Sequence, residues 1–169
     1  MLKKFITVIY LAAHCILFKS SDTPVAPRDV TVFLGGYDLE KYFEPGTLSV
    51  SPESIIVHPH WNPFSTRYDA DLAMILLQNS INFSNNIVPV CMLSPRQEEN
   101  IKEGIIVGYG QSEDKTKKHE TIPRVLKVPI ISNEECFLVN YVFAKLSSNR
   151  TFCGGSLNGM GACKGKSFY

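Results

Sequence analysis

The 169-residue chain lacks several features by which whole classes of protein are recognised. It has no C-x-x-C pair, which argues against a zinc ribbon or a thioredoxin-like redox motif. It has no apolar run of the about 18 residues that a membrane-spanning helix needs. It has no excess of charge of one sign, because 17 basic residues balance 16 acidic ones. We therefore expect no charged face for nucleic acid or for a cationic partner.

The residues that are present indicate a globular, secreted protein. Apolar residues make up 44% and charged residues 20%, which suits a domain that buries a core. Two N-glycosylation sequons, NFS at Asn82 and NRT at Asn149, favour secretion, as do the cysteines. An odd number of cysteines leaves at least one thiol without a partner in the chain. The cysteines are Cys15, Cys91, Cys136, Cys153 and Cys163.

Short β-branched and aromatic runs, separated by Gly and Pro, predict a mostly β chain. We expect strands at 29–39, 53–61, 71–77, 104–110 and 125–131. The first of these runs is broken by Gly35 and Gly36, and the second is stopped by Pro59. The run 71–77 is continuously apolar after its first residue, which predicts a strand buried on both faces.

One short helix is expected near 133–143. Ser132 and Glu135 form the S-x-x-E capping box before an apolar-rich run. The polar stretch 94–103 is interpreted as a connector between two β halves, residues 1–93 and residues 104–169.

Three residues in order suit nucleophilic hydrolysis. Such chemistry needs a nucleophile, a base that changes charge near neutral pH, and a carboxylate that orients the base. The chain offers His14 in AAHC, Asp71 in YDADLA and Ser167 in GKS. Gly165 precedes Ser167 by two residues, and a glycine there lets a substrate approach backbone N–H donors.

The order of these motifs resembles the chymotrypsin/trypsin-like serine proteases, and especially the secreted cascade members of arthropods. AAHC resembles the catalytic-histidine motif, YDADLAMILL the catalytic-aspartate motif and GACKG the approach to the serine. Between them IVPVCML, VGYG, VLKVPIIS, EECF and TFCGG follow the family's order. The resemblance covers residues 8–167, nearly the whole chain.

The resemblance implies an all-β fold of two β-barrels with the site between them. Both barrels are expected to be incomplete, because the chain is expected to be truncated at both ends. In the implied reaction Ser167 attacks the peptide carbonyl, His14 is the base and then the acid, and Asp71, rather than Asp69, orients His14. Gly165 and Ser167 would supply the oxyanion-hole N–H groups, and Gly161 would form the floor of the specificity pocket.

The resemblance also implies the cysteine pairing and the partners. It pairs Cys136 with Cys153 and leaves the other three cysteines unpaired within this chain. Cys15 and Cys163 resemble cysteines whose partners lie outside it, and Cys91 resembles one that tethers a pro-segment. We expect a secreted, extracellular protein that acts on a polypeptide substrate and needs no cofactor or metal.

Two interpretations remain open at the start of the chain. Residues 1–20 have the charged start and apolar core of a signal peptide, in which His14 has no role. The spacing from His14 to Asp71 follows the family instead, with the family's activation sequence and first strands upstream of Met1.

The chain departs from the family around Ser167. The family reads G-D-S-G-G, whereas Lys166 stands here for the aspartate, and Phe168 and Tyr169 stand for the glycines. Ser167 is therefore either the homologous nucleophile or an unrelated serine. Because the loop lacks its aspartate and the strand after it, we expect the chain as printed not to hydrolyse peptides at a useful rate.

These departures leave other functions open. A non-catalytic serine protease homologue would act as a binding or regulatory protein in an extracellular cascade. A truncated gene product would have no role of its own. Separately, His58 and His60 form an H-x-H that suits a metal, but no third ligand is evident, so a strand-end loop is the expected interpretation.

Overall fold

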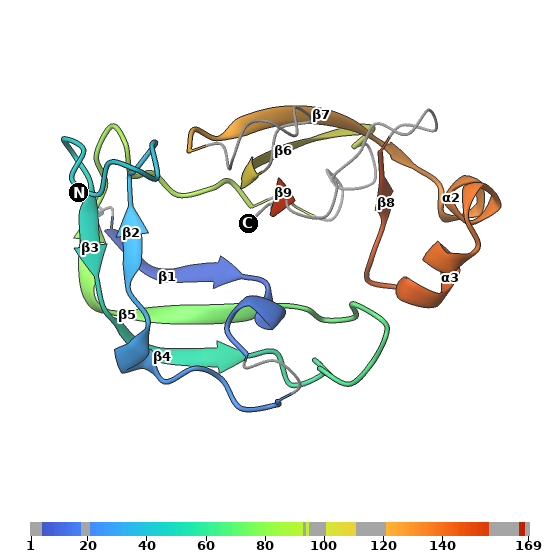
Figure 1. Cartoon of the computed structure of the whole chain (residues 1–169), viewed down its shortest axis with the longest axis horizontal. Coiled ribbons are helices and arrows are strands. Elements are labelled where there is room, and N and C mark those ends of the chain that lie inside the picture. The colour runs from blue at the N-terminus through green and yellow to red at the C-terminus, as the bar shows by residue number, and fades with distance from the viewer. Residues whose placement is uncertain are drawn as a thin grey trace. The chain divides into compact units, whose positions relative to one another are not determined.

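The computed structural model describes residues 5–17, 21–92, 94, 101–110, 121–155 and 166–167. The chain divides into two compact units, residues 1–37 with 41–90 and residues 38–40 with 91–169. All strand pairs in both units are antiparallel, and within the described ranges no sheet closes on itself (Figure 1). The expectation of an all-β chain with little helix is therefore confirmed.

The first unit contains a three-stranded sheet and a two-stranded sheet. The larger sheet has the order β1-β5-β4, and β2 pairs with β3 in the smaller one (Figure 1). The strands are β1 (Phe5–Leu11), β2 (Val32–Leu34), β3 (Leu48–Val50), β4 (Pro52–Val57) and β5 (Ala73–Asn82), and the 3-10 helices are η1 (Ala13–Cys15) and η2 (Pro27–Asp29).

The core of this unit lies on one face of β5. Ile75, Leu77 and Ile81 of β5 are buried together with Ile87, and apolar side chains of β1, β2, β3 and β4 pack against them. The side chains between them on β5 are less buried, as the alternating geometry of a strand requires. The prediction that this strand is buried on both faces is wrong, because an antiparallel sheet packs one face on its core.

Several strand limits differ from those expected. Only Val32–Leu34 of the expected strand 29–39 is a strand, and it stops at Gly35, whose φ is +75°. A side chain at Gly35 would bring its Cβ to 2.9 Å from the carbonyl oxygen of Gly46, so the turn needs glycine here. Strand β4 ends at Val57, just before the turn at Pro59.

The sequence did not predict β1 or β3. Strand β1 (Phe5–Leu11) lies inside the stretch that also resembles a signal peptide, and it pairs with β5 along most of its length. The three-residue strand β3 is shorter than the runs that a period-two pattern can identify.

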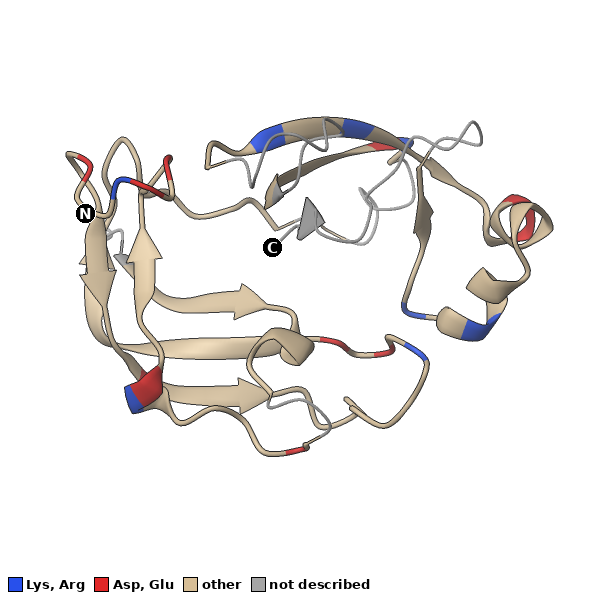
Figure 2. Ribbon diagram, in the orientation of Figure 1, with Lys and Arg blue, Asp and Glu red and all other residues tan. Residues whose placement is uncertain are grey.

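The second unit contains a four-stranded sheet and two short helices. The sheet has the order β8-β7-β6-β9 (Figure 1). Its strands are β6 (Glu103–Gly110), β7 (Arg124–Ile131), β8 (Cys153–Gly154) and β9 (Lys166–Ser167), and the helices are α2 (Asn133–Val139) and α3 (Val142–Leu146). Strands β6 and β7 begin within one residue of the expected positions. Figure 2 shows basic residues along β7, where Lys127 pairs with Glu103 of β6 at 3.5 Å.

The predicted capping box is confirmed, but the predicted helix is two helices. Ser132 Oγ accepts the backbone N–H of Glu135 at 3.2 Å, and the Glu135 carboxylate accepts the Ser132 N–H at 3.3 Å. Helix α2 ends at Val139. The next residue, Asn140, has an extended backbone, and its side chain accepts the N–H of Val142. An asparagine that bonds the backbone in this way competes with the helix, so the expected run to 143 is broken.

Most of the expected connector 94–103 lies outside the described residues. In the described part of the chain, no helix has the length and apolar character to cross a membrane.

Candidate active site

His14 lies in a single helical turn that the core holds in place. Strand β1 ends at Leu11, and the 3-10 helix Ala13–Cys15 follows after one residue. Ala13 is fully buried and Ile16 is 5% exposed, and both pack against Ala73 of β5. Buried neighbours on both sides therefore fix the backbone of His14, while its side chain stays about half exposed.

Strand pairing explains how Asp71 reaches His14 across 57 residues of sequence. Leu11 of β1 pairs with Ala73 of β5 in the antiparallel sheet. His14 follows the end of β1, and Asp71 precedes the start of β5. Because antiparallel neighbours run in opposite directions, these two ends lie side by side.

Two hydrogen bonds join His14 to Asp71. The His14 backbone N–H donates to Oδ1 of Asp71 at 2.9 Å, and Nδ1 of the imidazole lies 2.6 Å from Oδ2. An ionised carboxylate only accepts, so Nδ1 carries the proton and Nε2 is left to accept one. The Asp71 side chain is only 14% exposed, which strengthens a charge-assisted bond of this length.

The backbone just before Asp71 has an unusual conformation that the sequence does not predict. Ala70 has a φ of 56°. Glycine adopts this left-handed region freely, but other residues, apart from asparagine and aspartate, seldom do. The N–H of Leu72 donates to the carbonyl of Ala70 at 2.7 Å, which closes a tight turn around Asp71. This turn directs the Asp71 carboxylate toward His14 before β5 begins.

Tyr68 was not among the predicted site residues, although it is part of the YDADLA motif. Its ring lies edge-on to the His14 imidazole, with centroids 6.3 Å apart and 75° between the planes. Edge-to-face arrangements at centroid distances of about 4.5–7 Å are favourable for aromatic rings, so Tyr68 lies where it can stabilise the imidazole in this position. The spacing of Tyr68 before Asp71 is the signal that would have identified it.

The other predicted catalytic residues belong to the second unit. Ser167 is in β9, where its backbone pairs with Tyr109 of β6, and Lys166 pairs with Gly110. The side chain of Ser167 lies outside the part of the structure that is described, as do Gly161 and Gly165. The structure therefore brings together His14 and Asp71, and it places Ser167 by its backbone alone.

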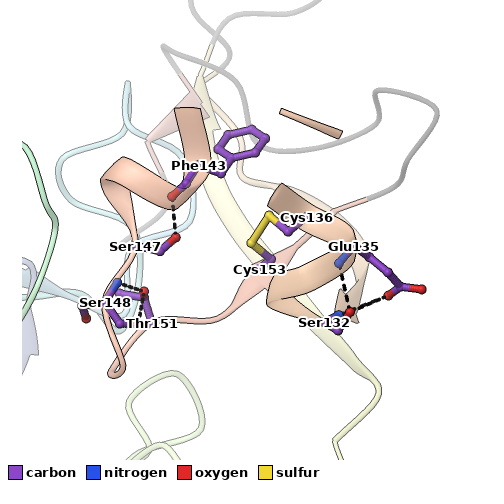
Figure 3. Close-up of a disulfide and its surroundings, with 8 residues drawn as sticks. All are labelled: Ser132, Glu135, Cys136, Phe143, Ser147, Ser148, Thr151 and Cys153. Carbon is purple, nitrogen blue, oxygen red and sulfur yellow. Dashed lines mark hydrogen bonds between the residues drawn. A yellow bond between two sulfur atoms is a disulfide. The ribbon is translucent and has the colours of Figure 1, made fainter. Parts of the chain in front are cut away.

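The structure joins Cys136 of α2 to Cys153 of β8 by a disulfide (Figure 3). Their Cα atoms are 6.3 Å apart and Cys136 is buried. Among the described cysteines, Cys91 is exposed and has a free thiol, and Cys15 is partly buried. Cys163 lies outside the described residues.

The two histidines of the H-x-H motif, His58 and His60, are hydrogen-bonded to each other in their loop. The two rings lie 5.3 Å apart, and Nδ1 of His58 accepts the backbone N–H of His60 at 3.1 Å. That bond uses one of the nitrogens that a metal would need. Across the described residues no three His, Cys, Asp or Glu side chains gather as metal ligands would.

Comparisons with known proteins match a range of residues that includes the candidate active site. A family model described as Trypsin matches residues 7–167, a range that includes His14, Asp71 and Ser167. The chain is 35% identical over 165 residues to Serine protease gd of Drosophila melanogaster, a match that covers 88% of the chain and 31% of that protein.

Two other insect proteins are similar over 94% of the chain. Phenoloxidase-activating factor 3 of Holotrichia diomphalia is 28% identical over 171 residues, which is 46% of its length. CLIP domain-containing serine protease HP8 of Bombyx mori is 26% identical over 170 residues, which is 45% of its length. The chain thus spans less than half of the length of these curated relatives.

Proposed function

Because the chain belongs to the trypsin family, we propose that it is a serine-type endopeptidase domain that hydrolyses peptide bonds in polypeptide substrates. The observation that carries the proposal is the pair of hydrogen bonds between His14 and Asp71. An imidazole that is held by a carboxylate through Nδ1 is the base that this chemistry requires.

The proposed mechanism is the His-Asp-Ser mechanism of the family. The hydroxyl of Ser167 attacks the peptide carbonyl, and Nε2 of His14 takes its proton and later gives it to the leaving amine. Asp71 holds His14 in the tautomer with the proton on Nδ1 and stabilises the imidazolium that forms. These roles follow the general mechanism of the family. The hydrogen bond between His14 and Asp71 supports the roles proposed for those two residues.

The proposed oxyanion hole consists of the backbone N–H groups of Gly165 and Ser167. Gly161 is proposed as the floor of the specificity pocket, and since glycine carries no charge, no preference for Arg or Lys in the substrate follows. Lys166, which stands where the family has aspartate, is expected to slow turnover. Loss of one oxyanion donor typically costs about 10²–10³ in rate.

Lys166 also supports a second candidate function. A family member with a disturbed oxyanion loop can still bind the partners that its surface recognises, without cleaving them. The alternative proposal is therefore a non-catalytic serine protease homologue that acts as a binding or regulatory protein in an extracellular cascade.

The setting proposed for either function is extracellular. Two of the relatives are called phenoloxidase-activating factor and CLIP domain-containing serine protease, which supports a role in a proteolytic cascade. The exposed free thiol of Cys91 is available to tether a pro-segment. Asn82 and Asn149 are exposed and are proposed to carry N-linked glycans.

A serine-directed probe distinguishes the two functions. The natural full-length protein is treated with a fluorophosphonate, and the labelled peptide is identified by mass spectrometry. In this full-length protein we expect label on Ser167, and we expect it to disappear in Ser167→Ala and to slow sharply in His14→Ala. The chain as printed, tested alone, is expected to show no useful turnover. A folded protein that takes up no label at Ser167, beside a labelled active protease, would establish the non-catalytic homologue instead.

A further inference from the structure

The segment between the disulfide partners Cys136 and Cys153 exposes several large apolar side chains. We call residues 136–153 the disulfide-closed segment. Three of its side chains are mostly exposed, Leu138 at 87%, Phe152 at 74% and Tyr141 at 64%. Its exposed large apolar residues are Leu138, Val139, Tyr141, Val142, Phe143 and Phe152.

Charge does little to keep this surface soluble. Lys145 and Arg150 are the only charged residues of the disulfide-closed segment, and Figure 2 shows α3 and the turn after it otherwise uncharged. The ammonium of Lys145 lies 4.8 Å from the centre of the Tyr141 ring, so it covers part of that ring only. Large exposed apolar surface on a secreted protein is normally covered by something, so we expect a covering group for the exposed side chains of this segment.

A modification sequon lies in the same segment, on a turn that is held firmly. The turn Ser148–Thr151 carries Asn149 at its second position. The Thr151 hydroxyl donates to the Ser148 carbonyl at 2.9 Å, and the Ser148 N–H donates back to that hydroxyl at 2.8 Å (Figure 3). The Arg150 N–H donates to the Ser148 hydroxyl at 3.1 Å. The side chain of Asn149 itself is exposed.

The turn Ser148–Thr151 is joined to α3 by a hydrogen bond just before it and to the disulfide through the residues just after it. The Ser147 hydroxyl donates to the Phe143 carbonyl at 2.8 Å, which ties the residue before the turn to the helix (Figure 3). Phe152 and Cys153 follow directly after the turn. Asn149 therefore projects from a rigid base that is covalently and locally joined to the exposed apolar residues.

We propose that Asn149 carries an N-linked glycan and that this glycan, rather than a second protein, covers the apolar side chains of the disulfide-closed segment. Glycans of this kind are bulky and solubilising, and they require a surface position such as this turn supplies. The proposal rests on the secretory setting proposed above and is independent of catalysis at Ser167.

The modification is a transfer from a lipid-linked oligosaccharide diphosphate in the secretory pathway. The side-chain amide nitrogen of Asn149 forms a bond to C1 of the first sugar and loses one proton. The bond from C1 to the diphosphate oxygen breaks, and the lipid diphosphate leaves with the bonding electron pair. No oxidation or reduction is involved.

The test begins with the natural full-length protein secreted from eukaryotic cells. Peptide mapping is done before and after an amidase that removes N-glycans and converts the modified asparagine to aspartate. We expect the Asn149 peptide to be glycosylated. We then expect enzymatic deglycosylation of the folded protein to raise the fluorescence of a dye that binds exposed apolar surface.

Matched variants locate the effect. Asn149→Gln is expected to raise dye binding in the secreted protein, whereas Asn82→Gln, which removes the sequon of the first unit, is expected to leave it unchanged. Thr151→Ser keeps both the sequon and the hydroxyl that bonds Ser148, and it is expected to behave as wild type. Leu138→Lys with Phe152→Lys is expected to abolish the rise on deglycosylation.

Three results would overturn the proposal. An unmodified Asn149 peptide would exclude the glycan, whether or not the Asn82 peptide is glycosylated. A glycosylated Asn149 whose removal leaves dye binding unchanged would exclude the covering role. A dimer, seen by sedimentation, that protects these side chains whether or not the glycan is present would assign the surface to a second copy.

Discussion

The carboxylate of Asp71 bonds both the imidazole and the backbone of His14, through Oδ2 at 2.6 Å from Nδ1 and Oδ1 at 2.9 Å from the backbone N. One side chain therefore fixes the ring tautomer and also the turn from which the ring projects. The pair connects the end of β1 to the start of β5, so the sheet and the site depend on the same pairing.

Replacing Asp71 tests this pair directly. In Asp71→Asn the amide can donate to Nδ1, which favours the wrong tautomer, and fluorophosphonate labelling of Ser167 is expected to slow by about 10⁴-fold. The Nδ1–H resonance of His14 in the proton NMR spectrum is expected to disappear as well. Asp69→Asn removes a charge from the same motif without touching the two bonds, and an equal effect of both variants would contradict the assignment.

The left-handed turn at Ala70 is expected to be sensitive to branching at Cβ. Ala70→Val is expected to destabilise the protein by about 1–2 kcal/mol or more, because β-branched residues resist this conformation, and to weaken the His14 Nδ1–H resonance. Ala70→Gly adopts the same φ freely, so its denaturation midpoint should lie close to that of wild type. A valine variant with an unchanged midpoint and resonance would show that the turn does not position Asp71.

Adjacent glycines give a matched test of the turn after β2. Gly35→Ala places a Cβ at 2.9 Å from the Gly46 carbonyl oxygen in a backbone with φ of +75°. We expect a loss of about 1–2 kcal/mol or more in the free energy of unfolding. Gly36→Ala meets only the Thr47 methyl group at 3.7 Å and should stay within about 0.5 kcal/mol of wild type in urea denaturation.

Removal of the Cys136–Cys153 disulfide is expected to destabilise the second unit. Closing a loop with a sequence separation of 17 is worth on the order of 3 kcal/mol in the chain-entropy model. Cys136→Ser should lower the denaturation midpoint, and adding Cys153→Ser should lower it little further, since the cross-link is already lost. Reduction of the wild-type protein is the control, and additive losses in the double variant would mean that the two cysteines act separately.

Local sequence patterns were enough to predict the family, the strand-rich fold and the start of α2. The order of the motifs from AAHC to GACKG identified the family because several matches in sequence are far more specific than any one of them. Ser132 and Glu135 located the start of α2 because a capping box is a local interaction that needs no tertiary partner. Glycine and proline likewise indicated where strands end, because each acts on the backbone conformation at its own position and needs no tertiary partner.

Contacts between residues far apart in the sequence depend on the strand pairing of the folded chain. The approach of His14 to Asp71 depends on the pairing of β1 with β5. The sequence left the alternative of a signal peptide open here, because the apolar core of a signal peptide and a buried strand are both apolar runs. The one-sided burial of β5 depends on which face packs against β2, β3 and β4, which an apolar sequence alone does not encode. The left-handed backbone of Ala70 runs against the local preference of alanine, so only the surrounding fold could impose it.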